Sequence, residues 1–323
     1  MHLGCSRLVP GLLLGVCSAV SADPLYVRNL APVAGLIGFP VLRDARVLER
    51  GNTVLELNSS VANTQNSDST NNEAVLLDGE TWRLAPRLRY GFAGGWELEA
   101  ELPWLRHSGG ELDKLIENWH DLWGLPDGNR DEMPRNRLFY GYSGSGAEFS
   151  HSNTASGLGD ASMAVTREIW RNPRAALSLR GQVKFASGDE DDWLGSGSED
   201  YSLGLGFSAT PTLESDWLWH GQLGYTRAGK IDQLGDIQER DLWFAGLGME
   251  WRAWETVHLK LQLDSHAAPA DSSLDQIGEP AVQLSAGVTW APASRWQLDF
   301  SFSEDIAVDT AADIVFQFGL RYR

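Results

Sequence analysis

The sequence has almost no cysteine. Cys5 and Cys17 are the only two, and both lie within the first 17 residues. A secreted chain that loses this segment has no disulfide to stabilise it, so its stability must come from a large core or from a closed sheet.

Long apolar runs and positive charge are also scarce. Beyond the first 22 residues no stretch of 18 consecutive residues is apolar, which excludes a membrane-spanning helix. Lys and Arg together number 26 against 44 Asp and Glu, which gives a formal net charge of −18. Such a chain repels phosphates, so nucleic acid is not an expected partner.

Residues 1–22 have the features of a secretory signal peptide. Arg7 precedes an apolar stretch from Leu8 to Val20, and small residues, Ser21 and Ala22, follow it. This arrangement predicts cleavage after Ala22 and export across the inner membrane.

The rest of the chain alternates between apolar and polar residues with a period of two. Leu259, Leu261 and Leu263, for example, alternate with Lys260 and Gln262. This period is typical of strands with one apolar face. We predict twelve strands near residues 52–62, 80–92, 95–106, 159–170, 175–187, 199–210, 216–228, 240–252, 255–266, 280–291, 295–304 and 312–322.

The predicted connections alternate in length. Those after the even strands are short, whereas those after the odd strands are longer, at 63–79, 107–158, 188–198, 229–239, 267–279 and 305–311. Outer-membrane barrels have short periplasmic turns and long outer loops, so the pattern favours an all-β transmembrane antiparallel up-and-down β-barrel over a soluble sandwich. Aromatic residues at the strand ends would form two girdles: Trp96, Trp170, Trp217, Trp251, Trp290, Trp296 and Tyr322 at the periplasmic end, and Trp82, Trp104, Phe185, Tyr201, Tyr225 and Trp243 at the outer end.

The 107–158 connection is too long to be inert. Between Gly109 and Gly124, apolar residues recur at helical spacing, which predicts one amphipathic helix in this outer loop. The helix is either a lid over the pore or packing on the rim. As a lid, its gate residues would be Leu112, Leu115, Ile116, Trp119 and Trp123.

Residues 23–50 contain several Pro and Gly residues and little alternation. We expect this segment to be either a plug inside the barrel (residues 51–323) or a periplasmic tail. The plug is favoured because apolar residues such as Leu30, Leu36 and Phe39 need cover from water.

The predicted inner face carries both charge signs. Three arginines on the second strand would lie beside three glutamates on the third, and these could pair across the strands. The charges either fill a narrow barrel with salt bridges or orient a polar solute. The candidate lumen charges are Arg83, Arg87, Arg89, Glu97, Glu99, Glu101, Arg180, Lys184, Lys260 and Asp264.

No catalytic, cofactor or metal site is predicted. His151 and Ser152 are adjacent, so on a strand they would point to opposite faces and could not cooperate. The acidic segment Ser187–Trp193 has no calcium-loop spacing and is expected to be a solvated face.

Three segments stand out as motifs: Pro24–Pro32, Leu112–Pro126 with Arg130 after it, and Gly157–Asp160. Together they resemble an uncharacterised proteobacterial outer-membrane family, domain of unknown function 3187. The chain is also distantly similar to barrels proposed as channels for aromatic compounds, which share Gly-x-Gly-Asp strand starts. The resemblance implies an outer-membrane barrel and brings no catalytic residues.

These observations together favour a passive channel or transporter for small solutes, apolar or aromatic ones among them. The alternatives are a structural or adhesive barrel with a filled lumen and an outer-membrane lipid hydrolase. The expected partners are outer-membrane lipid and lipopolysaccharide, the barrel-assembly machinery and a small-molecule solute, with no cofactor. The expected location is the outer membrane of a Gram-negative cell.

Overall fold

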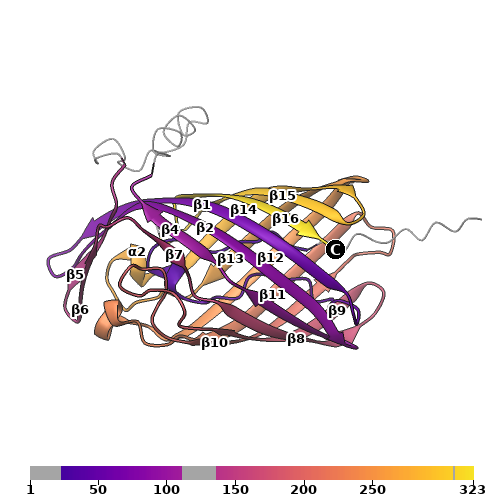
Figure 1. Ribbon diagram of the computed structural model, residues 1–323, viewed down its shortest axis with the longest axis horizontal. Coiled ribbons are helices and arrows are strands. Elements are labelled where there is room, and N and C mark those ends of the chain that lie inside the picture. Colours follow the sequence, from indigo (N-terminus) through magenta and orange to yellow (C-terminus); the bar gives the residue numbers. More distant parts are fainter. Residues whose placement is uncertain (1–22, 111–135, 308–309) are drawn as a thin grey trace, which may run out of the picture.

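A computed structural model describes residues 23–110, 136–307 and 310–323. Twelve antiparallel strands close into one barrel, in which each strand pairs with the wall strands that come before and after it in the chain, and the first, β1, also pairs with the last, β16 (Figure 1). This confirms the predicted up-and-down barrel. The wall consists of β1 (Thr53–Ser69), β2 (Ala74–Ala93), β3 (Trp96–Glu101), β8 (Ser162–Arg171), β9 (Ala175–Lys184), β10 (Asp200–Ala209), β11 (Trp217–Arg227), β12 (Asp241–Trp254), β13 (Val257–His266), β14 (Ala281–Ala293), β15 (Trp296–Asp305) and β16 (Ile314–Tyr322).

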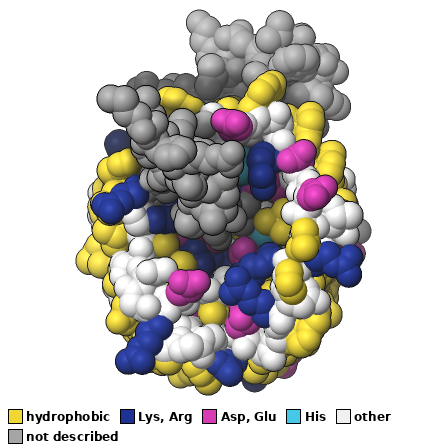
Figure 2. Space-filling view, turned by 90° about the vertical axis from the view of Figure 1, so that its right-hand side faces the viewer, with side chains coloured by type: hydrophobic (Ala, Val, Ile, Leu, Met, Phe, Trp, Pro, Cys, Tyr) yellow, Lys and Arg dark blue, Asp and Glu magenta, His cyan; other side chains and the backbone are white. Residues whose placement is uncertain are grey.

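The wall is apolar on the outside and polar on the inside. In β13, Leu259, Leu261 and Leu263 are 38–43% exposed, while the alternating Lys260 and Gln262 are buried. Figure 2 shows hydrophobic side chains around the barrel and charged side chains in its hollow end. This is the reverse of a soluble protein, and it places the barrel in a lipid bilayer, that of the outer membrane.

The predicted girdle residues face the outside of the wall. Twelve of the thirteen predicted aromatic side chains are exposed on the outer surface. The thirteenth, Tyr322, packs against Trp296 with 4.7 Å between ring centroids. Within the described residues, no helix is long and apolar enough to cross a bilayer.

Four further strands extend the wall at the end with the longer loops. They are β4 (Trp104–Ser108), β5 (Phe139–Gly144), β6 (Ala147–His151) and β7 (Ala155–Leu158). β4 continues β3 after a break at Leu102–Pro103, and β7 precedes β8 across a break at residues 159–161. Pro103 has no N–H to donate to a ladder, and the Gly159 N–H instead reaches the Pro103 carbonyl at 2.9 Å.

The predicted loop boundaries need two corrections. The loop at 63–79 is only the turn 70–73, because β1 and β2 stay paired up to Ser69 and Ala74. The 107–158 loop contains part of β4 and all of β5, β6 and β7. Residues 111–135, and therefore most of the predicted helix, lie outside the described residues. The described helical turns are short: η1 (Ala34–Leu36), η3 (Asp232–Ile237) and α2 (Asp275–Gly278).

Candidate functional site

Residues 23–50, here called the inner segment, run through the barrel and fold back on themselves. The segment begins beside Arg89 and Arg321, near the ends of β2 and β16. Asn29 of the segment contacts His266, the last residue of β13. The chain then turns at η1 and runs back, and the Leu48 N–H donates to Glu97 of β3. It therefore contacts wall strands on opposite sides of the lumen.

The half of the lumen at the end with the short turns, here called the lower half, contains a dense network of ion pairs. Glu101 lies at the centre of this network. It accepts hydrogen bonds from Arg83 at 2.5 Å and from Arg87 at 2.9 Å, both on the wall. It also accepts hydrogen bonds from Tyr26 at 3.1 Å and from Arg28 at 3.3 Å, both on the inner segment. Glu101 thus ties the inner segment to the barrel.

Strand register explains why these charges meet. Arg87 lies opposite Glu101, and Arg89 lies opposite Glu99. The Arg89 guanidinium also reaches Glu97 at 2.7 Å, and Arg180 of β9 reaches Glu99 at 2.8 Å. Within the low-dielectric lumen such bidentate pairs are held far more firmly than at a surface.

Asp23 occupies the lower end of the network. Its carboxylate lies 3.2 Å from Arg89 and 3.0 Å from Arg323, and Lys260 donates to its backbone carbonyl at 2.5 Å. Burial alone would raise the pKa of Asp23, but Arg89, Arg321, Arg43 and Arg323 hold it well below its ordinary value.

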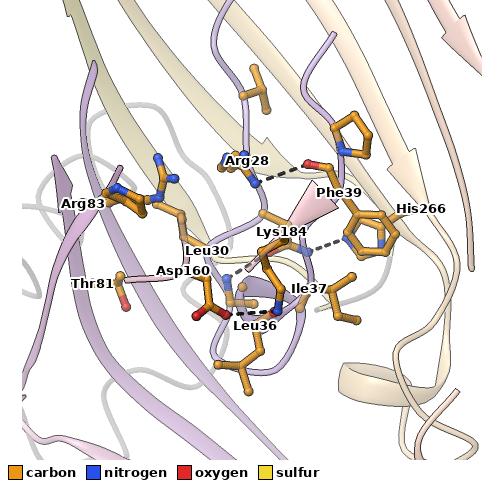
Figure 3. A pocket seen from close by; sticks show the side chains of 18 of the residues that line it. Arg28, Leu30, Leu36, Ile37, Phe39, Thr81, Arg83, Asp160, Lys184 and His266 are labelled. Atoms are coloured by element: carbon orange, nitrogen blue, oxygen red, sulfur yellow. Dashed lines mark hydrogen bonds and ion pairs between the residues drawn. The ribbon is translucent and has the colours of Figure 1, made fainter. Parts of the chain in front are cut away.

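A second ionic contact holds the inner segment near its turn. The Lys184 ammonium lies 3.0 Å from Asp160 and 3.1 Å from Asp200, and it donates to the Leu36 carbonyl at 2.9 Å (Figure 3). Asp200 in turn accepts from the Gly38 N–H at 2.7 Å. A Cβ at position 38 would lie 2.7 Å from the Lys184 side chain, so this close approach requires glycine.

The loop after β9 folds back over the lumen. Asp160 holds it by accepting from the backbone N–H groups of Ser187, Gly188 and Ser196. Asp191 and Asp192 are exposed, as expected for a solvated acidic face, but Trp193 turns inward and is only 5% exposed. Its φ of 60° is unusual for a bulky residue, which is consistent with a backbone constrained by its surroundings.

An apolar group of side chains, here called the mouth cluster, lies at the outer end of the lumen. It joins the turn of the inner segment to β2, the β5–β6 hairpin and the outer loops. Its buried members are Val33, Leu36, Ile37, Val75, Leu77, Leu138, Tyr140, Tyr142, Phe149, Trp193, Ala228, Ile231, Leu234, Ile237, Leu242, Ala270, Leu274 and Ile277.

A cavity of about 100 Å³ lies between the mouth cluster and the ion-pair network. Its apolar wall includes Leu30, Phe39 and Phe244, and its polar wall includes Lys184 and Asp264. A second void of about 20 Å³ shares Pro40, Gln222 and Phe244 with the first. The first cavity is large enough for several water molecules or for a small organic molecule, whereas the second holds about one water.

The structure places all ten candidate lumen charges on the inside of the wall. Nine of them have an oppositely charged side chain within 4 Å, and Asp264 is the exception among the described residues. The predicted gate residues Leu112, Leu115, Ile116, Trp119 and Trp123 lie outside the described residues. Sequence reasoning missed Trp193, Tyr140 and Asp160, since nothing local marks them as facing inward.

His151 and Ser152 do not form a catalytic pair. His151 is buried and stacks on Tyr140 with 6.1 Å between ring centroids, whereas Ser152 is exposed. Among the described residues, no three His, Cys, Asp or Glu side chains gather as metal ligands.

Comparisons with solved structures find chains that are similar to this one. The outer membrane channel COG4313 from Pseudomonas putida F1 is 15% identical with a TM-score of 0.54, over 86% of this chain and 97% of that one. The NanC porin is 7% identical with a TM-score of 0.49, over 83% and 99%. The toluene transporter TbuX from Ralstonia pickettii is 11% identical with a TM-score of 0.42, over 85% and 90%.

No curated protein matches the sequence. A family model described as "Protein of unknown function (DUF3187)" matches residues 11–323.

Proposed function

The chain belongs to the DUF3187 family of proteins of unknown function, and we propose that it is a passive outer-membrane channel for small solutes with an apolar or aromatic body. One observation carries the proposal. The lumen is obstructed by a chain segment that is separate from the wall strands, and a cavity remains beside that segment. A gated pore requires an obstruction that can be displaced, and a segment separate from the wall can undock without breaking the sheet.

The walls of the cavity support the class of solute. The outer entrance passes through the mouth cluster, whose members are aliphatic and aromatic. A fully hydrated inorganic ion would lose its water shell there, whereas a solute with an apolar body regains part of the desolvation cost of any polar head group through contact with these side chains. A solute that passes the cluster reaches Leu30, Phe39 and Phe244 next.

The test is to lock the inner segment. An ideal Cβ at Gly206 would lie 4.0 Å from the Cβ of Ala45, which is within the Cβ–Cβ range of a disulfide. The expected disulfide in Ala45→Cys with Gly206→Cys would fasten the segment to β10. The native cysteines, at positions 5 and 17 of the predicted signal peptide, are not expected to compete with it.

We expect the oxidised double variant to lose single-channel conductance and solute uptake in liposomes, and reduction to restore both. The two single-cysteine variants are the matched controls. Equal conductance before and after reduction would show that the inner segment does not gate the pore.

A second candidate is a structural barrel with a permanently filled lumen. The ion-pair network around Glu101 and Asp23 favours it, because such a network resists opening. In that case the reduced double variant and the wild-type protein both stay closed to every solute.

A further inference from the structure

Nearly all carboxylates on the lumen face are neutralised within the protein. Each of nine has a Lys or Arg nitrogen within 4 Å, as buried charges require. They are Asp23, Glu56, Glu97, Glu99, Glu101, Asp160, Asp200, Glu250 and Asp299.

Asp264 differs from these nine. It lines the cavity, and among the described residues no cationic side chain lies within ion-pair distance of it. Strand register explains the difference, because its cross-strand neighbours are Gly246 on β12 and Gln283 on β14. Glu101 faces Arg87 at the equivalent place in its own pair of strands.

The surroundings hold the Asp264 carboxylate in place without neutralising it. Gln262 donates to its Oδ2 at 2.8 Å. A Cβ at Gly246 would lie 2.9 Å from its Oδ1, so the absence of a side chain at position 246 makes room for the carboxylate.

His266 does not supply the missing charge. Its Nδ1 lies 2.8 Å from the Ala267 carbonyl, which makes Nδ1 the donor. Its Nε2 lies 3.0 Å from the Asn29 amide nitrogen, itself a donor, so Nε2 must accept. This network requires the neutral ring, which stacks on Phe39 with 4.3 Å between ring centroids.

A second side chain on the same wall also has a free polar group. Gln283 is 2% exposed and lines the cavity, and its Nε2 has no hydrogen-bond partner among the described residues. Buried amide groups are seldom left unpaired unless water or a ligand completes them. The polar wall of the cavity is therefore incomplete as it stands.

We propose that Asp264 and Gln283 form the polar end of a subsite for a small solute that carries a primary ammonium group on a short apolar body. The ammonium contacts the Asp264 carboxylate, and the apolar body lies against Leu30 and Phe39, which line the same cavity. Gln283 is available to a water or an oxygen of the solute. This proposal depends on the proposed channel function in one respect only: it assumes that the cavity lies on the path of the solute.

The test measures binding to the intact folded barrel in detergent by isothermal titration calorimetry. The probes are n-butylammonium, n-butanol and n-butyrate, which share an apolar body and differ in their head groups. The wild-type protein should bind butylammonium most tightly. Asp264→Asn keeps the shape of the side chain and should weaken butylammonium about tenfold or more, while butanol binding stays unchanged.

Two further variants sharpen the result. Gln283→Lys places a tethered ammonium directly opposite Asp264 and should abolish butylammonium binding. Asp299→Asn removes a carboxylate that is paired with Arg321 and does not line the cavity, so it should leave butylammonium affinity unaltered.

Equal butylammonium affinity in the wild-type protein and Asp264→Asn would overturn the subsite, as would butyrate binding as tightly as butylammonium. Conductance separates this result from the channel proposal. If the barrel binds butylammonium through Asp264 but never conducts, the subsite proposal stands and the channel proposal fails. If it conducts but its binding of butylammonium does not depend on Asp264, the channel proposal stands and the subsite proposal fails.

Discussion

Replacing Glu101 with Gln should release the inner segment from the barrel. Glu101 accepts hydrogen bonds from Tyr26 and Arg28 of that segment, and it is buried. Each charge-assisted hydrogen bond contributes roughly 1.5–3 kcal/mol, so losing the charge weakens docking by about 3 kcal/mol. That corresponds to an increase of roughly a hundredfold in the undocked population.

Thiol labelling can measure this population. Ala45 is fully buried and lies beside Ser208, so a cysteine at position 45 is protected while the segment is docked. Labelling of Ala45→Cys by a water-soluble maleimide should be about a hundredfold faster in the Glu101→Gln background, because the rate follows the open population.

The matched control is Glu250→Gln. Glu250 is also a buried glutamate on the lumen face, but its side-chain partners are His258 and Lys260 of the wall, so it reaches the inner segment only through Lys260, which donates to the Asp23 carbonyl. If Glu250→Gln accelerates labelling as much as Glu101→Gln, or if neither does, the Glu101 network does not hold the segment.

Two other predictions concern orientation and acid. An epitope inserted at Asn72, in the exposed β1–β2 turn, should be accessible on intact cells, whereas one at Ser294 should react only after the outer membrane is opened. The opposite result would mean that the barrel has the opposite orientation in the membrane. The pKa of Asp23 is held well below its ordinary value in the docked state. The Asp23 carboxylate therefore stabilises docking fully at any pH above the ordinary pKa of an aspartate, and this stabilisation is lost only when the pH falls through the lowered pKa. The labelling rate of Ala45→Cys should therefore be constant between pH 5 and 8 and should increase only in strong acid. Each rate is divided by that of an exposed cysteine, which corrects for the pH dependence of thiolate reactivity. A rate that increases between pH 8 and 5 would contradict the lowered pKa of Asp23.

The membrane-embedded wall could be predicted from the sequence because lipid enforces alternation. Wherever one face meets lipid and the other the lumen, as along Val257–His266, the period of two is visible. Beyond the bilayer this constraint ends. The continuation of β1 through Asn63–Ser69 is polar on both faces, so its sequence predicts a loop although its pairing with β2 is unbroken.

The site was less predictable because it depends on register and on the path of the inner segment. The pairing of Arg87 with Glu101 could be anticipated from adjacent strands, but the Tyr26 and Arg28 contacts required the path of a segment without periodicity. The isolation of Asp264 is visible only once Gly246 and Gln283 are known to face it. Trp193 gave no signal, because an acidic surface loop precedes it.

The contact between Asp23 and Arg323 has a kinetic consequence. These residues are 300 positions apart, and β1 and β16 are also joined by Arg321 with Glu56. Contacts of such long sequence separation form late, after most of the loop-closure entropy has been lost. We therefore expect the seam between the first and last wall strands to close, and the inner segment to dock, together in one late step of folding, so that a barrel still open at that seam also lacks a docked inner segment.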